Sequence, residues 1–88
     1  MSFEVKINKS VDKNITKLPQ NIRKKFNVLL EDLRDKGPIL KNWPNFSSIG
    51  TDKYHCHLAY HWVACWRCEK KSIVIEVYYA GSREKAPY

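Results

Sequence analysis

The sequence lacks the long apolar runs of membrane proteins and the even cysteine number of disulfide-rich secreted domains. No run approaches the roughly 18 apolar residues of a transmembrane helix, and the opening segment MSFEVKINKS has no apolar signal-peptide core. The three cysteines, Cys56, Cys65 and Cys68, are odd in number and crowd into one short stretch. They predict a reducing compartment without a disulfide framework. We therefore expect a cytoplasmic protein with no membrane partner.

Acidic residues are also scarce. Nine Asp and Glu face sixteen Lys and Arg, which gives a net charge of +7 at pH 7 with His neutral. Such a balance attracts polyanions, whether nucleic acid, an acidic protein or an anionic membrane surface. The same charge lies within the range of roughly 2 to 8 that keeps a small domain soluble. Charge alone therefore does not choose the partner.

The length of 88 residues leaves room for one hydrophobic core, so residues 1–88 are predicted to form a single domain. Apolar residues make up 43% of the chain and include three Trp, five Tyr and three Phe. There is no internal repeat or low-complexity segment. Because a domain of this size is only marginally stable, a partner that covers one face would add to its stability.

The N-terminal half predicts one strand and two helices. Apolar and polar residues alternate from Phe3 to Ile7, as in a strand with one covered face. Ser10 is placed to cap a short helix, and Pro19 to end it and open a second helix. Gly37 and Pro38 end this second helix. The buried stripes would carry Val11, Ile15 and Leu18, then Ile22, Phe26, Leu29, Leu30 and Leu33.

The C-terminal half predicts a loop and a three-stranded antiparallel meander. Residues 39–52 mix Pro, Gly, Asn and Ser with single apolar anchors, as a loop pinned to a core does. The β-rich runs are Tyr54–Leu58, Trp62–Arg67 and Ser72–Tyr79. The predicted fold is α+β in the order β-α-α-β-β-β. Its two helices would pack on one face of a twisted, mainly antiparallel four-stranded sheet and leave the other face open.

Strand alternation assigns side chains to that open face. His55 and His57 would point to it, while Tyr54, Cys56 and Leu58 would point to the helices. In the next strand the outward residues would be His61, Val63, Cys65 and Arg67, and the inward residues Trp62, Ala64 and Trp66. In the last strand the outward residues would be Val74, Glu76 and Tyr78, and the inward residues Ile73, Ile75, Val77 and Tyr79. The tail GSREKAPY would bring Arg83, Lys85 and Tyr88 to the sheet end.

These residues allow several interpretations. The histidines could be polar residues on a solvent-exposed strand face, could contact RNA or transfer protons, or could bind a metal. Metal is the least favoured, because the His-x-His pair has no suitably placed third ligand and Cys65 and Cys68 would point to opposite faces. We therefore expect no metal and no cofactor. Trp43, Trp62 and Trp66 suit either base stacking or the core.

Several segments resemble the RelE/ParE superfamily of bacterial toxin–antitoxin toxins: FEVKINKSVDKNITKLP, LRDKGP, KYHCHLAYHWVACW and IEVYYAGSREKAPY. The resemblance covers nearly the whole chain, and its most specific part is a last strand that runs into Gly-x-Arg and a terminal Tyr. It implies a RelE/HigB-like mRNA interferase, an endoribonuclease that cuts messenger RNA on the ribosome and is held inactive by a cognate antitoxin. Arg83 and Tyr88 occupy the positions of the family's arginine and C-terminal tyrosine.

The resemblance and the chemistry of RNA cleavage together suggest roles. His55, His57 and His61 stand where many members of the family have arginine. We predict His61 as one proton-transfer group, with His57 or Glu76 as the second, and Arg83 on the scissile phosphate. Tyr88 would position the nucleotide or share in the proton transfer. Further RNA contacts are expected from His55, Lys17, Lys24, Lys25, Lys53 and Lys85. Two alternatives stay open, a ParE-like inhibitor of DNA gyrase and a non-catalytic relative that binds RNA and its antitoxin.

Overall fold

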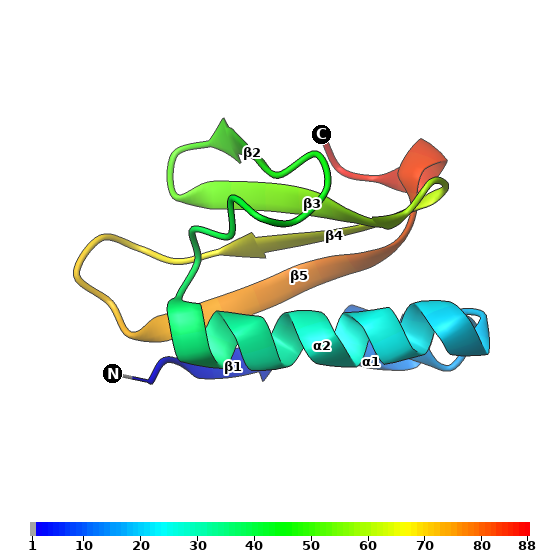
Figure 1. Ribbon diagram of the computed structural model, residues 1–88, viewed down its shortest axis with the longest axis horizontal. Coiled ribbons are helices and arrows are strands. Elements are labelled where there is room, and N and C mark those ends of the chain that lie inside the picture. The colour runs from blue at the N-terminus through cyan, green and yellow to red at the C-terminus, as the bar shows by residue number, and fades with distance from the viewer. Residues whose placement is uncertain (1) are drawn as a thin grey trace.

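A sheet and a layer of two helices make up the computed structural model, which describes residues 2–88 (Figure 1). The five strands lie in the order β1-β5-β4-β3-β2. Strand β1 pairs with β5 in parallel, and the other neighbours are antiparallel. The elements are β1 (Glu4–Ile7), α1 (Lys9–Ile15), α2 (Gln20–Lys36), β2 (Ser47–Gly50), β3 (Lys53–Ala59), β4 (Trp62–Arg67), β5 (Val74–Ser82) and the 3-10 turn η1 (Arg83–Lys85).

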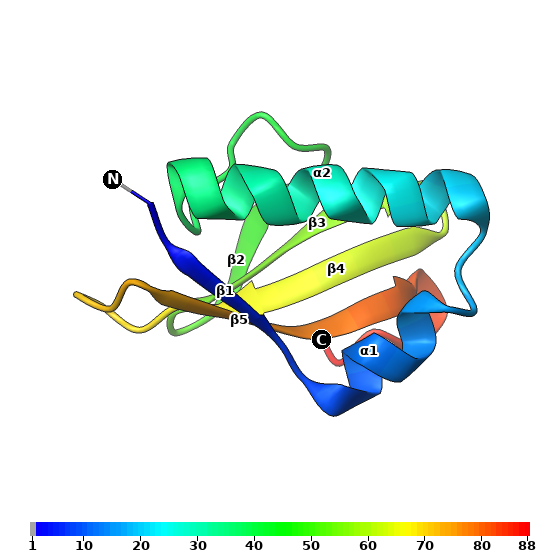
Figure 2. The ribbon, with the colours of Figure 1, turned by 90° about the horizontal axis from the view of Figure 1, so that it is seen from below.

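Both helices cover the same face of the sheet, as predicted (Figure 2). The apolar stripe of α2 is buried against that face, with Phe26, Leu29 and Leu33 fully enclosed together with Trp66 of β4. Each such side chain contributes about 1.5–3 kcal/mol by leaving water. This packing explains why the helices form where the 3.6-residue pattern places them. Neither helix is long and apolar enough to cross a membrane.

The first helix begins earlier than predicted. Asn8, not Ser10, is the N-terminal cap: its backbone is extended, and its Oδ1 accepts a hydrogen bond of 2.9 Å from the Val11 backbone N–H. Ser10 lies inside the helix and donates to the same oxygen at 3.2 Å. The second helix follows Pro19 and ends at Gly37, whose φ of 87° suits glycine. The predicted start and end of this helix are therefore confirmed.

Strand β2 is the fifth strand, which the sequence pattern did not predict. Ser47 lies opposite His55 of β3, and Ser48 lies opposite Tyr54. β2 is an edge strand with one neighbour, and Ser47, Ser48 and Gly50 are exposed. Because no side of β2 is fully covered, its sequence needs no hydrophobic alternation, and residues 47–50 therefore resemble a loop.

A bulge in β5 changes which residues face the helices. Cys65 of β4 lies opposite Tyr79, but Trp66 lies opposite Val77, so Tyr78 is the extra residue. Since opposite residues share a face, Tyr79 lies with Cys65 on the side away from the helices, and Ala80 enters the core.

Two core predictions for the last strand are consequently wrong. Tyr79 lies on the open face because of the bulge, and Ile73 precedes β5 and is 55% exposed. The strand also begins two residues later than predicted and runs to Ser82, past the predicted end at Tyr79. Ile75 and Val77 are buried, as predicted.

Candidate active site

The C-terminal segment folds back over the open face and forms one end of the candidate site. After β5, the Arg83 backbone N–H donates to the His61 carbonyl oxygen at 2.8 Å, which fixes η1 to the turn between β3 and β4. The chain then turns back toward β3 (Figure 1), and the Tyr88 ring centre lies 4.5 Å from that of His55. Arg83 and Tyr88 thus lie on the same face as the histidines of β3.

His57 is the histidine best placed to exchange a proton. Its side chain is partly exposed, and its Nδ1 lies 3.2 Å from the Asn45 side-chain amide nitrogen. Partial burial lowers the pKa of His57 below its ordinary 6.5, and the nearby His55 and Arg83 lower it further. The ring is therefore mainly neutral at pH 7 and has a lone pair that can accept a proton.

Tyr88 has the opposite protonation behaviour. Burial raises the pKa of its phenol, as do Cys65 and Tyr79, while the positive charge of Arg83 lowers it. The phenol therefore keeps its proton at neutral pH and can donate a hydrogen bond. Arg83 itself is exposed, and its Cζ atom lies 5.4 Å from the centre of the Tyr60 ring. A planar cation is thus held beside the neutral base and the phenol.

The alternation placed His61 with the outward residues of a strand, but His61 lies in a turn. This turn joins β3 to β4 and consists of Tyr60 and His61. Its exposed ring stands edge-on to Tyr60, with 4.6 Å between ring centres. Arg83 contacts the same Tyr60 ring. His61 therefore lies exposed at the rim of the site, beside Arg83.

His55 is more buried than its predicted role as an RNA contact would suggest. Only 8% of the residue is exposed, and its Nδ1 lies 3.0 Å from the Ser47 Oγ of β2. The rings of His57 and Tyr88 pack against it, at 5.7 and 4.5 Å between centres. In this position His55 supports Tyr88. The contact between His55 and Ser47 has no signature in the sequence, because it depends on strand β2, which the residue pattern does not predict.

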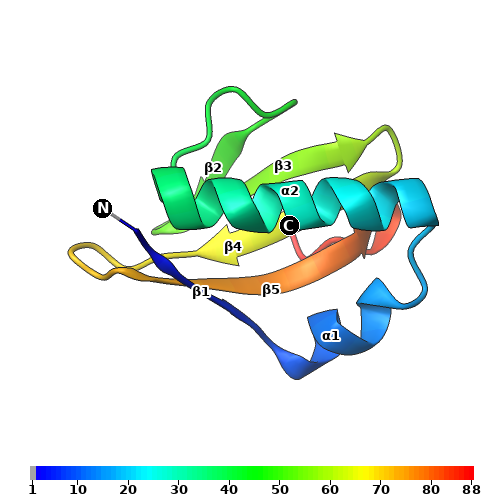
Figure 3. The same cartoon turned by 60° about the horizontal axis from the view of Figure 1, so that its bottom comes forward.

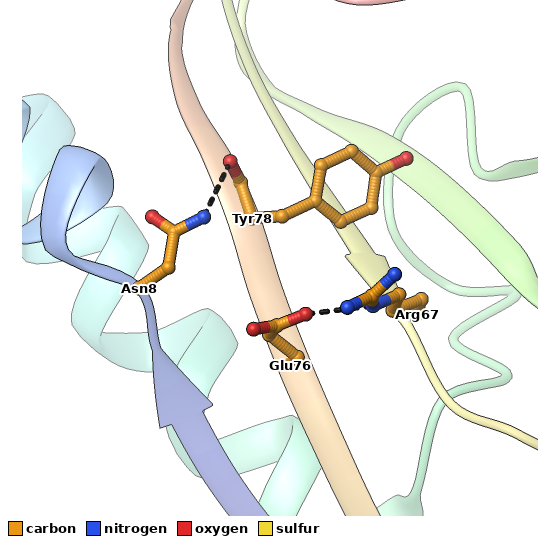
Figure 4. A network of polar contacts seen from close by, with 4 residues as sticks. All are labelled: Asn8, Arg67, Glu76 and Tyr78. Carbon is orange, nitrogen blue, oxygen red and sulfur yellow. Dashed lines mark hydrogen bonds and ion pairs between the residues drawn. The ribbon is translucent and has the colours of Figure 1, made fainter.

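Glu76 lies away from the other predicted catalytic residues. Its Oε1 accepts a 2.6 Å hydrogen bond from Arg67 Nε (Figure 4). From Glu76, β5 runs on for most of its length before it reaches Arg83, a distance of about 20 Å at the usual rise of a strand. The structure therefore does not bring Glu76 to His57, Arg83 and Tyr88.

The predicted lysine contacts are spread over the molecule. Lys53 lies beside Arg67, at the Glu76 end of the open face. Lys17 and Lys85 line a hollow of about 320 Å³ between α1 and the end of β5. Lys24 and Lys25 are exposed on α2, which covers the opposite face of the sheet (Figure 3). Of these lysines, Lys53 lies on the open face, and Lys17 and Lys85 lie near the end of β5.

The cysteines and histidines are not arranged as a metal site. Cys56, Cys65 and Cys68 are buried thiols without a disulfide. Cys68 belongs to the core beneath the helices, whereas Cys65 faces the other way. Within residues 2–88, no group of three or more His, Cys, Asp or Glu side chains is placed to hold a metal ion.

The fold is that of the RelE toxins. No family model matches the chain, and no curated protein matches its sequence. Solved structures do match over nearly the whole chain, and they include RelE and YoeB toxins, alone or in toxin–antitoxin complexes. The resemblance to the RelE/ParE superfamily that the sequence suggested is thereby confirmed for the fold.

Three of these structures show the extent of the likeness. RelE in the archaeal RelE–RelB complex from Pyrococcus horikoshii OT3 has a TM-score of 0.76 and 21% identity, over 98% of this chain and 100% of that chain. The isolated RelE toxin of E. coli has a TM-score of 0.73 and 16% identity, over 98% and 89%. The YoeB–YefM complex from Staphylococcus aureus has a TM-score of 0.73 and 10% identity, over 94% of this chain and 99% of that chain.

Proposed function

We propose that this protein is the toxin of a toxin–antitoxin system and cleaves messenger RNA on the ribosome. The observation that carries the proposal is the meeting of His57, Arg83 and Tyr88 on one face of a RelE-like fold. These side chains supply a neutral base, a permanent cation and a protonated phenol. The combination suits the cleavage of a phosphodiester by its own 2′-hydroxyl group.

The reaction divides among these groups. The base removes the proton of the 2′-hydroxyl, whose oxygen attacks the adjacent phosphorus, and an acid protonates the 5′-oxygen as its bond to phosphorus breaks. Arg83 suits the phosphorane, because its planar guanidinium donates two parallel hydrogen bonds and stays charged. Acid–base groups of this kind contribute roughly 10² to 10⁴ in rate each.

His57 acts as the base through Nε2, since Nδ1 faces the Asn45 amide. In that role Nδ1 carries the proton, and the Asn45 amide turns by half a rotation to present its oxygen as the acceptor. This turn leaves the shape of the amide unchanged, because its oxygen and nitrogen simply exchange places. The amide thus fixes the ring orientation in the manner of the third member of a catalytic triad.

Two other groups near Arg83 are candidates for the acid. Tyr88 keeps its proton at neutral pH, and His61 stands exposed at the rim beside Tyr60. We assign the acid role to His61, which the sequence suggested only as one of two proton-transfer groups, and assign Tyr88 to holding the nucleotide against Arg83. Separate His61→Ala and Tyr88→Phe variants test which residue is the acid. If His61 is the acid, loss of the Tyr88 hydroxyl group should lower the cleavage rate less than loss of the His61 imidazole.

The partner that restrains such a toxin is an antitoxin. A protein of net charge +7 attracts an acidic, partly disordered chain that orders as it binds. The RelBE structure from E. coli and the YoeB–YefM structure from Staphylococcus aureus are toxin–antitoxin complexes of those proteins. Pull-down of the product of the adjacent gene tests the assignment, and failure of any neighbour to bind would contradict it.

Cleavage itself is tested with purified ribosomes that carry a defined message. His57→Ala and Arg83→Ala should each lower the rate of mRNA cleavage at least about tenfold and relieve growth inhibition. Arg34→Ala, which removes a charge from the exposed side of α2, should cleave like the parent. All variants should unfold at similar denaturant concentrations. Undiminished cleavage by both site variants would refute the site, and inhibition of gyrase on supercoiled DNA without RNA cleavage would refute the function.

A further inference from the structure

The open face has a second charged end, far from Arg83. Four directly opposite residues cross the sheet there: Lys53 of β3, Arg67 of β4, Glu76 of β5 and Lys6 of β1. Three are basic and one is acidic. The row therefore keeps a net positive charge although Glu76 binds Arg67.

The Arg67 side chain has hydrogen-bonding capacity to spare. It is 56% exposed, and its described hydrogen bond to Glu76 uses Nε alone. Within residues 2–88 neither terminal amino group has a described hydrogen bond, so the pair can bind a phosphate in the two-pronged manner of arginine. Lys53, which lies directly opposite Arg67, adds a second cation.

Tyr78 lies beside this row because it follows Glu76 by two residues on β5 and so shares its face of the sheet. The Asn8 side-chain amide donates to the Tyr78 carbonyl oxygen at 3.2 Å, which fixes the backbone there (Figure 4). The ring extends from β5 to the side of Arg67, as Figure 4 shows. These two side chains line a hollow of about 230 Å³ together with Asn8, Lys53 and Glu76. An aromatic ring next to cations in an open hollow is the usual platform for single-stranded nucleic acid.

We propose that Arg67, Lys53 and Tyr78 form a second RNA subsite that binds the single strand several nucleotides from the bond held at Arg83. The inference rests on the proposed function, since it assumes that RNA lies on the open face. Phosphates contact Arg67 and Lys53, and a base stacks on Tyr78. The span of about 20 Å between the two ends means that only an RNA of several nucleotides occupies both.

The competing explanation is that the charged row only stabilises the sheet through ion pairs between neighbouring strands, which we call an ion ladder. The two explanations predict opposite signs for Glu76→Gln. Loss of this carboxylate removes a negative charge beside the phosphate, so a subsite predicts tighter RNA binding. A ladder predicts lower stability and no gain in affinity.

Binding is measured by fluorescence anisotropy with fully 2′-O-methylated RNAs, which have no free 2′-hydroxyl and stay uncleaved. For an RNA of about ten nucleotides, Arg67→Gln and Tyr78→Ala should each weaken binding about fivefold or more, and Glu76→Gln should strengthen it. For an RNA of about four nucleotides, the effect of Arg67→Gln should be at most about twofold, because the Arg83 end can still bind it. Arg34→Gln is the matched control and should leave both affinities unchanged.

Each outcome bears on a different statement. Equal affinity of Arg67→Gln and Arg34→Gln for the longer RNA, or weaker binding by Glu76→Gln, overturns the subsite even if the protein cleaves mRNA. A parent protein that binds neither RNA overturns it too, as does an Arg67→Gln variant that loses affinity only for an acidic protein partner. Length-dependent binding without cleavage on ribosomes supports the subsite and refutes the proposed nuclease.

Discussion

The three histidines of one short segment occupy three different environments. His55 is buried under Tyr88, His57 is partly exposed next to Arg83, and His61 lies in a turn. Their separation follows from single contacts: Ser47 holds His55, and Asn45 holds His57. A proton-transfer role therefore suits His57 and His61 far better than His55, although all three look alike in the sequence.

His57 should titrate below pH 6.5 in the folded protein, because burial and two neighbouring groups disfavour its charged form. Arg83→Gln removes one of these charges and should raise the pKa toward 6.5, which NMR of the imidazole C–H protons measures directly. If His57 is the base, cleavage is lost as the pH falls through this pKa. Arg34→Gln should leave the titration unchanged. A parent pKa at or above 6.5 would contradict the geometry.

At the level of strands and helices, sequence patterning succeeded where one face of an element is covered. The helices, β1 and the three strands of the meander follow from periodicity, because their buried faces demand apolar residues. Strand β2 is an edge strand with little covered surface, and the bulge at Tyr78 changes the register without changing composition. Both depend on pairing with distant residues, which local patterns do not encode.

Gly81 should be required for the shape of the end of β5. A Cβ atom at this position would lie 2.9 Å from Tyr79 Oη, which donates a 2.6 Å hydrogen bond to the Ser82 carbonyl oxygen. Gly81→Ala should therefore destabilise the protein by about 1–3 kcal/mol in urea unfolding. Because Arg83 follows directly, RNA cleavage should fall as well.

Gly50→Ala is the matched control, since the nearest atom to its new Cβ would be Lys53 Cδ at an ordinary 3.6 Å. A Tyr79→Phe change in the Gly81→Ala background removes the closest atom and should recover part of the stability, so the two substitutions should be non-additive. Equal stability of the two alanine variants would show that the Tyr79 ring moves aside freely.

The molecule as a whole packs most of its apolar side chains, the tryptophans included, beneath the helices, and the other face carries the histidines of β3, Arg67, Tyr78 and Tyr79. Composition predicted one small basic α+β domain, and the order of elements predicted which face is free. The location of the site at one end of that face was harder to foresee. It arises because residues 86–88 return over the sheet, a path set by the bond between Arg83 and His61 and not by any strand pattern.

All three cysteines should report global unfolding. Burial raises the pKa of the Cys56 and Cys65 thiols to about 12, with Cys65 adding to the shift of Cys56, and it raises that of Cys68 too. A thiol reagent at pH 8 should therefore modify the folded protein far more slowly than the protein in urea, because the thiolate is the reactive form. An added thiol at exposed Lys41 (Lys41→Cys) should react at once. Rapid modification of the native cysteines would contradict the packing.

The placement of β5 between β1 and β4 also sets the order in which the chain can fold during synthesis. β1 emerges from the ribosome early, yet its only strand partner is made some seventy residues later. A parallel pair of such separation closes late and slowly. Arg83 and Tyr88 follow β5, so the candidate site is completed after every other part of the sheet. Until β5 is made, the nascent chain lacks the strand that connects β1 to the rest of the sheet, and the candidate site is not assembled.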